Sequence, residues 1–429
     1  MHTLVELLNV SHADAWELIE RENQGWEFYF IKHALDQNRV RNTKTIDIKV
    51  YCQLEEGFIG SASGCFSPSL SKEEYEKEIA QLIENAKLVK NPYFKLNEPK
   101  EGKKQDNGAV DVSMIAKDFI ETMQEVEETK TEDLNSYEIF VDEVRVHYQN
   151  SNGVDVESVY PSSMLEVVVN ARKEDHEIEL YRMYHSGTCD KQSIKEELAN
   201  TMRYGKDKLI AKDTPALQKA DVLFTTSAAI DLYDDFIDQM SGAMKYRQIS
   251  NAEKGKPIIE GASGDVFTIK AVPSLPNSSM NQAYDAEGAP IYERVLIEKN
   301  IAKNFIGSRQ FCYYIQEEDT FIPGNYEVSG GSKKEEELRE GNYLEVVEFS
   351  DFQVDTFNGD MAGEIRLAYW HHDGEVEVVS GGSISGNLRE LAKNMFASEK
   401  QKQYNNYKIP ALTRLNDVIV TGITRNEED

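Results

Sequence analysis

Apolar and polar positions alternate along much of the chain, and this alternation predicts strands more often than helices. In KTIDIKVYCQLEEGFIGSASG, residues 44–64, apolar side chains alternate at Ile46, Ile48, Val50 and Cys52, a Glu-Glu-Gly turn follows, and residues 58–61 return. A period of two interrupted by a polar turn is typical of a β-hairpin. The following run, SLSKEEYEKEIAQLIENAKLV, changes to a helical period, and Ser71 with Glu74 forms a capping box at its start. Residues 3–20 and 24–36 suggest helix or mixed structure, so residues 1–92 are predicted to form an N-terminal α+β unit.

Residues 93–112, PYFKLNEPKEGKKQDNGAVD, are polar and contain prolines and glycines, which predicts a linker or long surface loop. A second unit follows over residues 113–218. It starts with a helical stretch and continues, over residues 137–186, with alternating strands separated by the turns NSNG and PSS. This pattern predicts an antiparallel meander. A helix over residues 190–209, capped by Asp190, closes the unit.

Residues 219–429 form the third and longest segment. A short apolar run at 222–224 precedes a helix that Thr226 or Ser227 caps. From residue 260 onward, strands separated by Gly, Asn and Pro turns dominate, with a late helix in NLRELAKNMFAS and a last strand in DVIVTGIT. The predicted fold class is α+β: N-terminal α/β-type units with an antiparallel meander, followed by a strand-rich antiparallel C-terminal domain.

Composition excludes several classes of protein. The chain carries 76 acidic and 47 basic residues, and the resulting net charge of −29 disfavours contact with nucleic acid. No run of 18 apolar residues exists, and the N-terminus lacks the basic region and the small-residue cleavage site of a signal peptide. The four cysteines (Cys52, Cys65, Cys189 and Cys312) show no CxxC spacing, which favours a reducing cytoplasm.

One stretch invites a metal-site hypothesis. DHEIELYRMYHSGTCD, residues 175–190, holds His176, Glu177, His185 and Cys189. A zinc-protease helix needs a second histidine four residues after the first, and Leu180 stands there instead. The stretch has the period of a strand, on which His176 and His185 would point to opposite faces. We therefore expect a strand ending in a turn; if zinc were bound here, these four residues would be its first candidate ligands.

Two further groups contain chemically active residues. Asp231, Asp234, Asp235 and Asp238 lie on a common face of one predicted helix, where they either form a solvated acidic surface or bind a hard cation. His371, His372 and Asp373 fall at a predicted hairpin turn exposed to solvent. The glycine-rich SGGS and SGGSISGN segments lack the Walker pattern, and no G-x-S-x-G elbow is present.

Four stretches, in order, resemble the TldD/PmbA family, also described as modulators of DNA gyrase. They are EEGFIGSASG, VHYQNSNGVDVESVYP, YDAEGAPIYERVLIEKNIAKNFI and FNGDMAGEIRLAYWHHDGEVEVVSGGSISGNLRELAKNM. The resemblance covers essentially the whole chain and is nearest to the PmbA, or TldE, branch. The matching turns contain Asn150, Asn152, Gly153, Asp285, Gly288, Gly386 and Asn387.

The resemblance implies a role in peptide cleavage. In this family the catalytic subunit carries H-E-x-x-x-H on a helix after a short strand, and a distant cysteine adds a zinc ligand. The corresponding helix here, SAAIDLYDDFIDQMSGAM, has no histidine, and Cys312 is the last cysteine. The resemblance therefore implies a non-catalytic subunit without its own cofactor, paired with a zinc-bearing TldD-like partner and handling unfolded peptides. Asp231, Asp234, Asp235 and Asp238 would then line a chamber or interface.

Two alternatives remain at this stage. One is a stand-alone homodimeric scaffold that binds peptides without a protease. The other is a hydrolase in which the four aspartates and a cation form an unrecognised active site.

Overall fold

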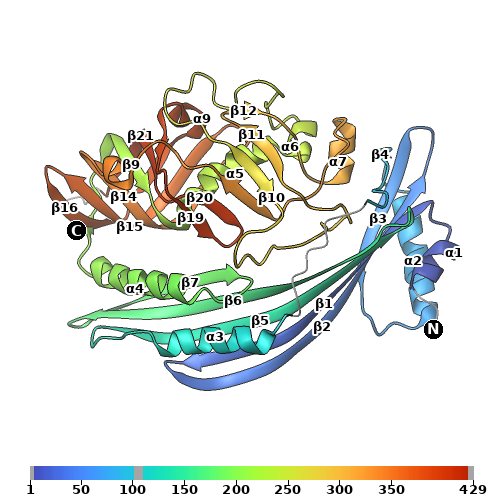
Figure 1. Cartoon of the computed structure of the whole chain (residues 1–429), viewed down its shortest axis with the longest axis horizontal. Helices are drawn as coiled ribbons and strands as arrows, with labels where there is room; N and C mark the ends of the chain where they lie inside the picture. The colour runs from blue at the N-terminus through green and yellow to red at the C-terminus, as the bar shows by residue number, and fades with distance from the viewer. Residues whose placement is uncertain (1–3, 101–109, 424–429) are drawn as a thin grey trace.

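The computed structural model describes residues 4–100 and 110–423, and it arranges them as a sheet of long strands beneath a strand-rich C-terminal domain (Figure 1). The N-terminal sheet has seven strands in the order β4-β3-β2-β1-β5-β6-β7, with every neighbouring pair antiparallel. Its strands are β1 (Ala15–Ile31), β2 (Ala34–Gln53), β3 (Phe58–Phe66), β4 (Asn91–Pro92), β5 (Glu132–Asn150), β6 (Asp155–Lys173) and β7 (His176–Ser186).

Four helices cover this sheet in two pairs. α1 (Leu4–Val10) and α2 (Lys72–Ala86) pack on one end of it, and α3 (Val112–Gln124) and α4 (Lys191–Lys208) pack on the other. The predicted capping box is present, because the Glu74 amide donates to Ser71 Oγ and the Ser71 amide donates to Glu74 Oε2. Asp190 caps α4 as expected, by accepting a hydrogen bond from the Ser193 amide.

The sheet changes the predicted division of the N-terminal half. The ranges 1–92 and 113–218 do not form separate sheets, because β1 pairs with β2 on one side and with β5 on the other. The stretch predicted as helix or mixed structure is helical only in α1 and becomes the long strand β1. PSS is not a turn: Pro161 lies within β6 opposite Glu143, since the fixed backbone angle of proline is compatible with an extended chain. The predicted linker includes residues 101–109, which lie outside the described part of the chain.

The C-terminal domain contains two sheets. One has six strands in the order β12-β11-β10-β13-β20-β19, and in the other the pairings β14–β9–β21–β17–β15–β14 close a ring of five strands. Most pairs are antiparallel as predicted, but β9–β14, β13–β20 and β8–β16 are parallel. The strands are β8 (Lys212–Asp213), β9 (Leu217–Phe224), β10 (Ile269–Val272), β11 (Arg294–Glu298), β12 (Ile301–Ala302), β13 (Asn325–Val328), β14 (Tyr343–Val354), β15 (Asp360–His372), β16 (Glu375–Ser380), β17 (Ser383–Asn387), β18 (Phe396–Ala397), β19 (Gln401–Tyr404), β20 (Tyr407–Pro410) and β21 (Thr413–Thr421).

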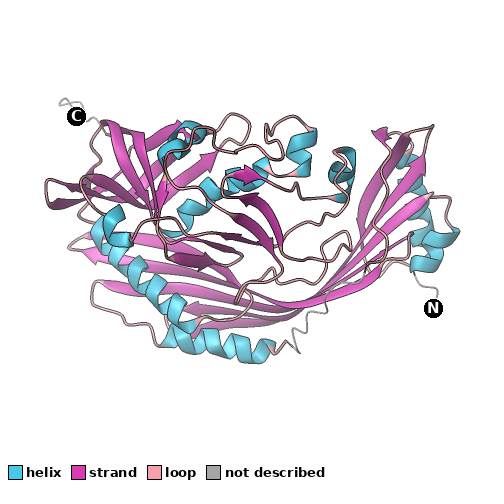
Figure 2. Ribbon diagram, turned by 45° about the horizontal axis from the view of Figure 1, so that its top comes forward, coloured by secondary structure: helices cyan, strands magenta, loops and turns pink. Residues whose placement is uncertain are grey.

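One helix organises the core of this domain. α5 (Ala229–Gln239) follows the short helix η1 (Thr226–Ala228), and its Tyr233 and Phe236 are buried in a core cluster that includes residues of both sheets. Figure 2 shows how short helices and loops surround these sheets. The remaining helices are α6 (Gly242–Tyr246), α7 (Arg309–Tyr314), α8 (Glu335–Leu338), α9 (Leu388–Leu391) and η2 (Ala392–Asn394). The predicted late helix is thus only the short pair α9 and η2, and Met395 beyond it is fully buried.

The predicted α+β class is confirmed. Within residues 4–100 and 110–423, no helix combines the length and apolar character needed to cross a membrane.

Candidate functional site

A cavity of about 700 Å³ opens between the N-terminal sheet and the C-terminal domain. Consecutive residues of three strand regions line it: 181–186 of β7, 347–352 of β14 and 402–407 of β19 and β20. One face of α4 and residues at the start of α5, including Asp231, complete the wall. A cavity of this size accommodates a small ligand or several side chains of a peptide.

Strand edges surround this cavity. β7 is the last strand of the seven-stranded sheet, and β19 is the last strand of the six-stranded sheet. β14 pairs with β9 only over Leu344–Val346, so on that side its residues 347–352 have no strand neighbour among the residues described. Main-chain N–H and C=O groups at a strand edge are the groups that bind an extended peptide.

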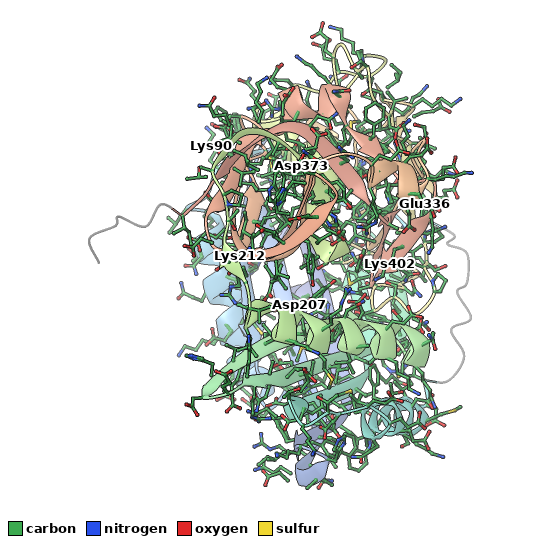
Figure 3. All side chains as sticks on the ribbon, turned by 90° about the vertical axis from the view of Figure 1, so that its left-hand side faces the viewer. Lys90, Asp207, Lys212, Glu336, Asp373 and Lys402 are labelled. Atoms are coloured by element: carbon green, nitrogen blue, oxygen red, sulfur yellow. The ribbon has the colours of Figure 1, made fainter. Side chains whose placement is uncertain are left out.

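Two ion pairs join the N-terminal part to the C-terminal domain at the cavity wall. Arg182 Nη1 of β7 lies 3.1 Å from Glu348 Oε1 of β14, and the Glu348 side chain is only 8% exposed. Lys402 of β19 is paired with Glu197 of α4. Figure 3 shows Lys402 above α4 and also labels Asp207, which belongs to α4. The Asp207 carboxylate accepts a hydrogen bond of 2.6 Å from the Tyr369 hydroxyl. These contacts fix the spacing between the strand edges.

Aromatic side chains make up much of the remaining wall. Tyr184, Tyr204, Tyr404, Tyr407 and Phe349 all line the cavity. Burial raises the pKa of the Tyr184 hydroxyl to about 12, and it raises the pKa values of Tyr404 and Tyr407 further. These hydroxyls therefore stay protonated at physiological pH. In this neutral form they donate hydrogen bonds and do not act as bases.

The four aspartates of α5 do not form the solvated acidic surface that the sequence predicts. Asp231 lines the cavity, and burial followed by repulsion from Asp234 raises its pKa to about 6. Burial also raises the pKa of Asp234 to about 6, although a hydrogen bond from Tyr407 opposes the shift. Both carboxyl groups are half-buried, because the rest of the domain packs around this helix.

The other two aspartates of α5 face a different environment. Asp235 is 3% exposed, and its carboxylate oxygens are buried in the protein interior. Burial raises its pKa to about 6, although Arg389 opposes the shift. Asp238 accepts a hydrogen bond of 3.3 Å from the Thr356 hydroxyl. Of the four predicted site residues, the structure therefore places only Asp231 on the cavity wall.

A second polar centre lies where the sheet contacts the C-terminal domain. Glu17 of β1 is buried, and it accepts hydrogen bonds from the hydroxyls of Tyr148, at 2.7 Å, and Tyr51. Burial and the neighbouring Glu17 carboxylate raise the pKa values of both tyrosines. Glu17 was not among the predicted site residues, although an acid between the apolar residues Trp16 and Leu18 was a usable signal.

The loop with Asp285 and Gly288 docks against this centre. Asp285 is buried and accepts hydrogen bonds from the amides of Glu287, Ala289 and Ile322, at 2.9, 2.8 and 2.7 Å. Burial raises the pKa of Glu287 to about 8, with repulsion from Asp285 as the second cause. Burial raises the pKa of Asp285 itself to about 6. These carboxyl groups have structural partners throughout and belong to the contact between the two parts of the chain.

The structure brings two of the predicted family turns together. Asn150 accepts hydrogen bonds from the amides of Asn152 and Val154, and Gly153 takes a φ of +89°. A Cβ on Gly288 would lie 2.8 Å from Val154, so the two turns touch. The third predicted turn is not part of this contact: Gly386 and Asn387 lie in β17, where the Asn387 amide group donates to Asp360 Oδ1 at 3.0 Å.

The histidines are placed as strand and turn residues. β7 is a strand over His176–Ser186 as predicted, and nine residues of extended chain, about 30 Å, separate His176 from His185. His371 is half-buried and stacks on Tyr343, with ring centroids 4.2 Å apart, whereas Asp373 takes the predicted turn at a φ of +51°. Burial raises the pKa of the Cys189 thiol to about 11. In residues 4–100 and 110–423, no three or more His, Cys, Asp or Glu side chains are grouped so as to hold a metal ion.

Comparison with known proteins identifies similar chains. Residues 217–422 match the family model described as PmbA/TldA metallopeptidase C-terminal domain. No curated protein matches the sequence significantly. TldE from Thermococcus kodakarensis is similar in structure, with a TM-score of 0.75, 18% identity and coverage of 96% of this chain and 97% of that one.

Two further solved structures share the fold. A proposed modulator of DNA gyrase from Thermotoga maritima has a TM-score of 0.74 at 19% identity, with 95% of each chain covered. A protein of the same description from Bacteroides thetaiotaomicron has a TM-score of 0.76 at 17% identity, with 97% of this chain and 96% of that chain covered.

Proposed function

Because the chain belongs to the TldD/PmbA family, we propose that it is a non-catalytic, TldE-like subunit of a cytoplasmic zinc metallopeptidase complex. Its role would be to bind unfolded or small peptides in extended form, next to a zinc-bearing TldD-like partner. Zinc and the general base would come from that partner, where zinc-activated water performs the hydrolysis.

The observation that carries this proposal is the composition of α5 at the cavity. α5 follows the short strand β9 and begins at the cavity wall, where the resemblance places H-E-x-x-x-H in the catalytic branch. Ser227, Ala228, Ile230 and Asp231 are the residues that this region contributes to the wall here. Neutral imidazole and thiolate are the side chains that bind zinc most often, and this wall segment contains neither.

The strand edges support the binding of extended peptides. Edges of β7, β14 and β19 meet at one cavity, and main-chain pairing to such an edge demands little of the peptide sequence. The tyrosines and Phe349 of the wall offer apolar surface for side chains of varied shape. This combination suits a subunit that holds unfolded segments of many sequences.

The first experiment measures zinc and activity together. The purified chain is dialysed, its zinc content is measured by elemental analysis, and peptide cleavage is assayed with and without a homologue that carries H-E-x-x-x-H. We expect well below one zinc per chain and cleavage only when the homologue is present. One tightly bound zinc per chain, or cleavage by the chain alone, would contradict the proposal.

The second experiment tests extended binding at the cavity. A fluorescently labelled unstructured decapeptide is compared with its backbone N-methylated form, which cannot donate main-chain hydrogen bonds at the methylated positions. We expect N-methylation to weaken binding at least about tenfold. Ser227→Trp, which fills the cavity mouth from an exposed position, should also weaken binding, whereas the exposed control Ser69→Trp should not. Equal affinity for both peptides would refute strand addition.

A stand-alone homodimeric peptide-binding scaffold is the second candidate function. The long exposed edge of β2 favours it, because symmetric pairing is common among soluble proteins. This second candidate would be supported if the chain binds peptide but no peptide cleavage appears when the zinc-bearing homologue is added.

A further inference from the structure

The charges on the wall of the cavity do not balance. The wall carries five acidic and three basic side chains, which are Asp190, Glu197, Asp231, Glu348, Asp351, Arg182, Arg366 and Lys402. Arg182 is paired with Glu348 and Lys402 with Glu197. Within the described part of the chain, the other three acids and Arg366 form no ion pair, so negative charge is in excess. A cleft lined mainly by one sign of charge attracts groups of the opposite sign.

The ion pair between Arg182 and Glu348 adds to this excess, because it holds only one carboxylate oxygen. Arg182 Nη1 donates to Glu348 Oε1 at 3.1 Å and also to the backbone oxygen of Tyr181 at 2.9 Å. Glu348 Oε2 is buried, and it receives no hydrogen bond from the residues described. A bidentate arginine would bind both oxygens of the carboxylate. The charge of Glu348 is therefore incompletely compensated and contributes to the negative potential of the wall.

Asp231 is the wall carboxylate best placed to bind a cation. The other aspartates of α5 have partners, which are Tyr407 for Asp234, Arg389 for Asp235 and Thr356 for Asp238. Burial and repulsion from Asp234 raise the pKa of Asp231 to about 6, and no basic side chain of the described residues opposes this rise. Asp231 is therefore largely ionised at neutral pH, half-buried on the wall and without a countercharge.

The aromatic rings of the same wall suit the aliphatic stem of a long basic side chain. Lys402 already uses such a combination of contacts, because its Nζ lies 5.1 Å from the centroid of the Tyr404 ring while it is paired with Glu197. A lysine or arginine of a bound peptide can likewise place its methylene groups on aromatic surface and its charge against a carboxylate. The wall offers both kinds of surface in one cavity.

The strand edges determine which part of a peptide supplies the cation. A peptide paired with the edge of β14 or β19 uses its main chain for hydrogen bonds, and every second side chain then points to one face. α5 packs against β14 and against β20, the neighbour of β19, so the start of α5 is close to both edges. A side chain from such a strand can therefore reach Asp231. A metal ion fits less well, because the described residues contain no group of three potential ligands.

We propose that the cavity selects peptide segments that carry a lysine or arginine, and that Asp231 binds the cationic side chain. This inference rests on the proposed function and adds to it the class of peptide, since segments with a basic residue are bound in preference to neutral or acidic ones. The net charge of −29 attracts any cationic peptide at long range. A local contact differs from this general attraction because it depends on one carboxylate, and the experiment uses that difference.

The experiment compares three fluorescently labelled decapeptides that differ only at a central position, which is lysine, norleucine or glutamate. Both ends are blocked, and norleucine keeps the stem of lysine without its charge. Dissociation constants are measured at neutral pH by fluorescence anisotropy. We expect the wild-type chain to bind the lysine peptide at least about tenfold more tightly than the norleucine peptide. Asp231→Asn should reduce this ratio to about twofold or less, Asp231→Glu should retain it, and Asp231→Lys should favour the glutamate peptide.

The matched control is Glu260→Gln, which removes one negative charge at an exposed position outside the cavity wall and should leave the ratio unchanged. Thermal denaturation shows that each variant is folded. A preference for lysine that persists in Asp231→Asn would come from the net charge and would overturn the inference. Equal binding of the lysine and norleucine peptides by the wild-type chain would overturn it while leaving peptide binding intact. If no peptide binds, the proposed peptide-binding role fails together with this inference, so the two failures are distinguishable.

Discussion

Arg182 Nη1 lies 3.1 Å from Glu348 Oε1, and this ion pair links the last strand of the N-terminal sheet to β14 of the C-terminal domain. The two side chains are 22% and 8% exposed, so their attraction is poorly screened by solvent. Arg182→Met keeps most of the aliphatic volume but leaves the Glu348 carboxylate buried without a countercharge. We expect the free energy of unfolding to fall by about 3 kcal/mol in urea denaturation.

The double variant Arg182→Met, Glu348→Gln supplies the control. Removing both charges should recover much of the lost stability, because no charge is then buried alone. If the double variant is as unstable as Arg182→Met, the loss comes from packing of the arginine stem and the ion-pair explanation is wrong.

Glu287 makes stability depend on pH. Burial and Asp285 raise its pKa from 4.5 to about 8, so the folded chain keeps a proton on this carboxyl that the unfolded chain releases. Below about pH 4.5 both states are protonated and the group has no effect. Between about pH 4.5 and 8 the unfolded state loses its proton first, and the free energy of unfolding declines as pH rises.

Glu287→Gln should remove this decline. The glutamine oxygen still accepts the hydrogen bond from the Arg309 amide, which is 2.6 Å from the carboxylate, and the side chain cannot ionise. We expect the variant to exceed wild type in stability by about 4 kcal/mol at pH 8 and to match it near pH 4. Urea denaturation at the two pH values measures the difference; parallel pH profiles for the two proteins would contradict the assignment to Glu287.

Local patterns predicted the elements that local residues determine. The strand at His176–Ser186 followed from its period of two, and the start of α4 from Asp190, whose carboxylate receives the Ser193 amide. The joining of the two N-terminal units did not follow, because it depends on pairs such as Glu17 with Asn150, which are far apart in the sequence. Residues 15–31 were misread for the same reason: their burial depends on strands that no local pattern identifies.

The candidate site was predictable only in part. The helix after β9 and its aspartates were identified, but their exposure was not, since the packing of Asp235 depends on Arg389 and other distant segments. The cavity is assembled from residues between 181 and 407 in the sequence, and its wall contains no motif. Arg182 and Glu348 look like ordinary strand residues until the two domains are brought together.

Gly288 marks how closely the loop approaches the sheet. It takes a φ of +72°, and a Cβ there would lie 2.5 Å from the ring of Tyr148. Gly288→Ala therefore combines backbone strain with a steric clash. Gly57→Ala is the matched control, because Gly57 has a φ of +81° and nothing lies within 4 Å of a Cβ there.

We expect Gly57→Ala to cost about 1 kcal/mol through backbone strain alone, and Gly288→Ala to cost about 2–3 kcal/mol more. Thermal and urea denaturation of the two variants measure the difference. Equal losses would mean that the loop moves away from Tyr148 freely, and the close contact between sheet and loop would then be unimportant for stability.

Burial of the Asp235 carboxyl group lowers the stability of the folded chain when the group is ionised, and asparagine at this position removes that effect. Burial raises its pKa from 3.8 to about 6, which means that the folded chain binds this proton more tightly than the unfolded chain. Stability contributed by the protonated form is complete below about pH 4 and is lost as pH rises to about 6. Asp235→Asn keeps the shape of the side chain without the charge, so the variant should be more stable than wild type by about 3 kcal/mol at pH 8 and close to it near pH 4. The control is Asp373→Asn, since Asp373 is exposed and asparagine tolerates its positive φ. Urea denaturation at both pH values compares the three proteins.

A variant less stable than wild type at pH 8 would show that the Asp235 charge is stabilised in place, most directly by Arg389, and that this carboxylate is ionised in the folded chain.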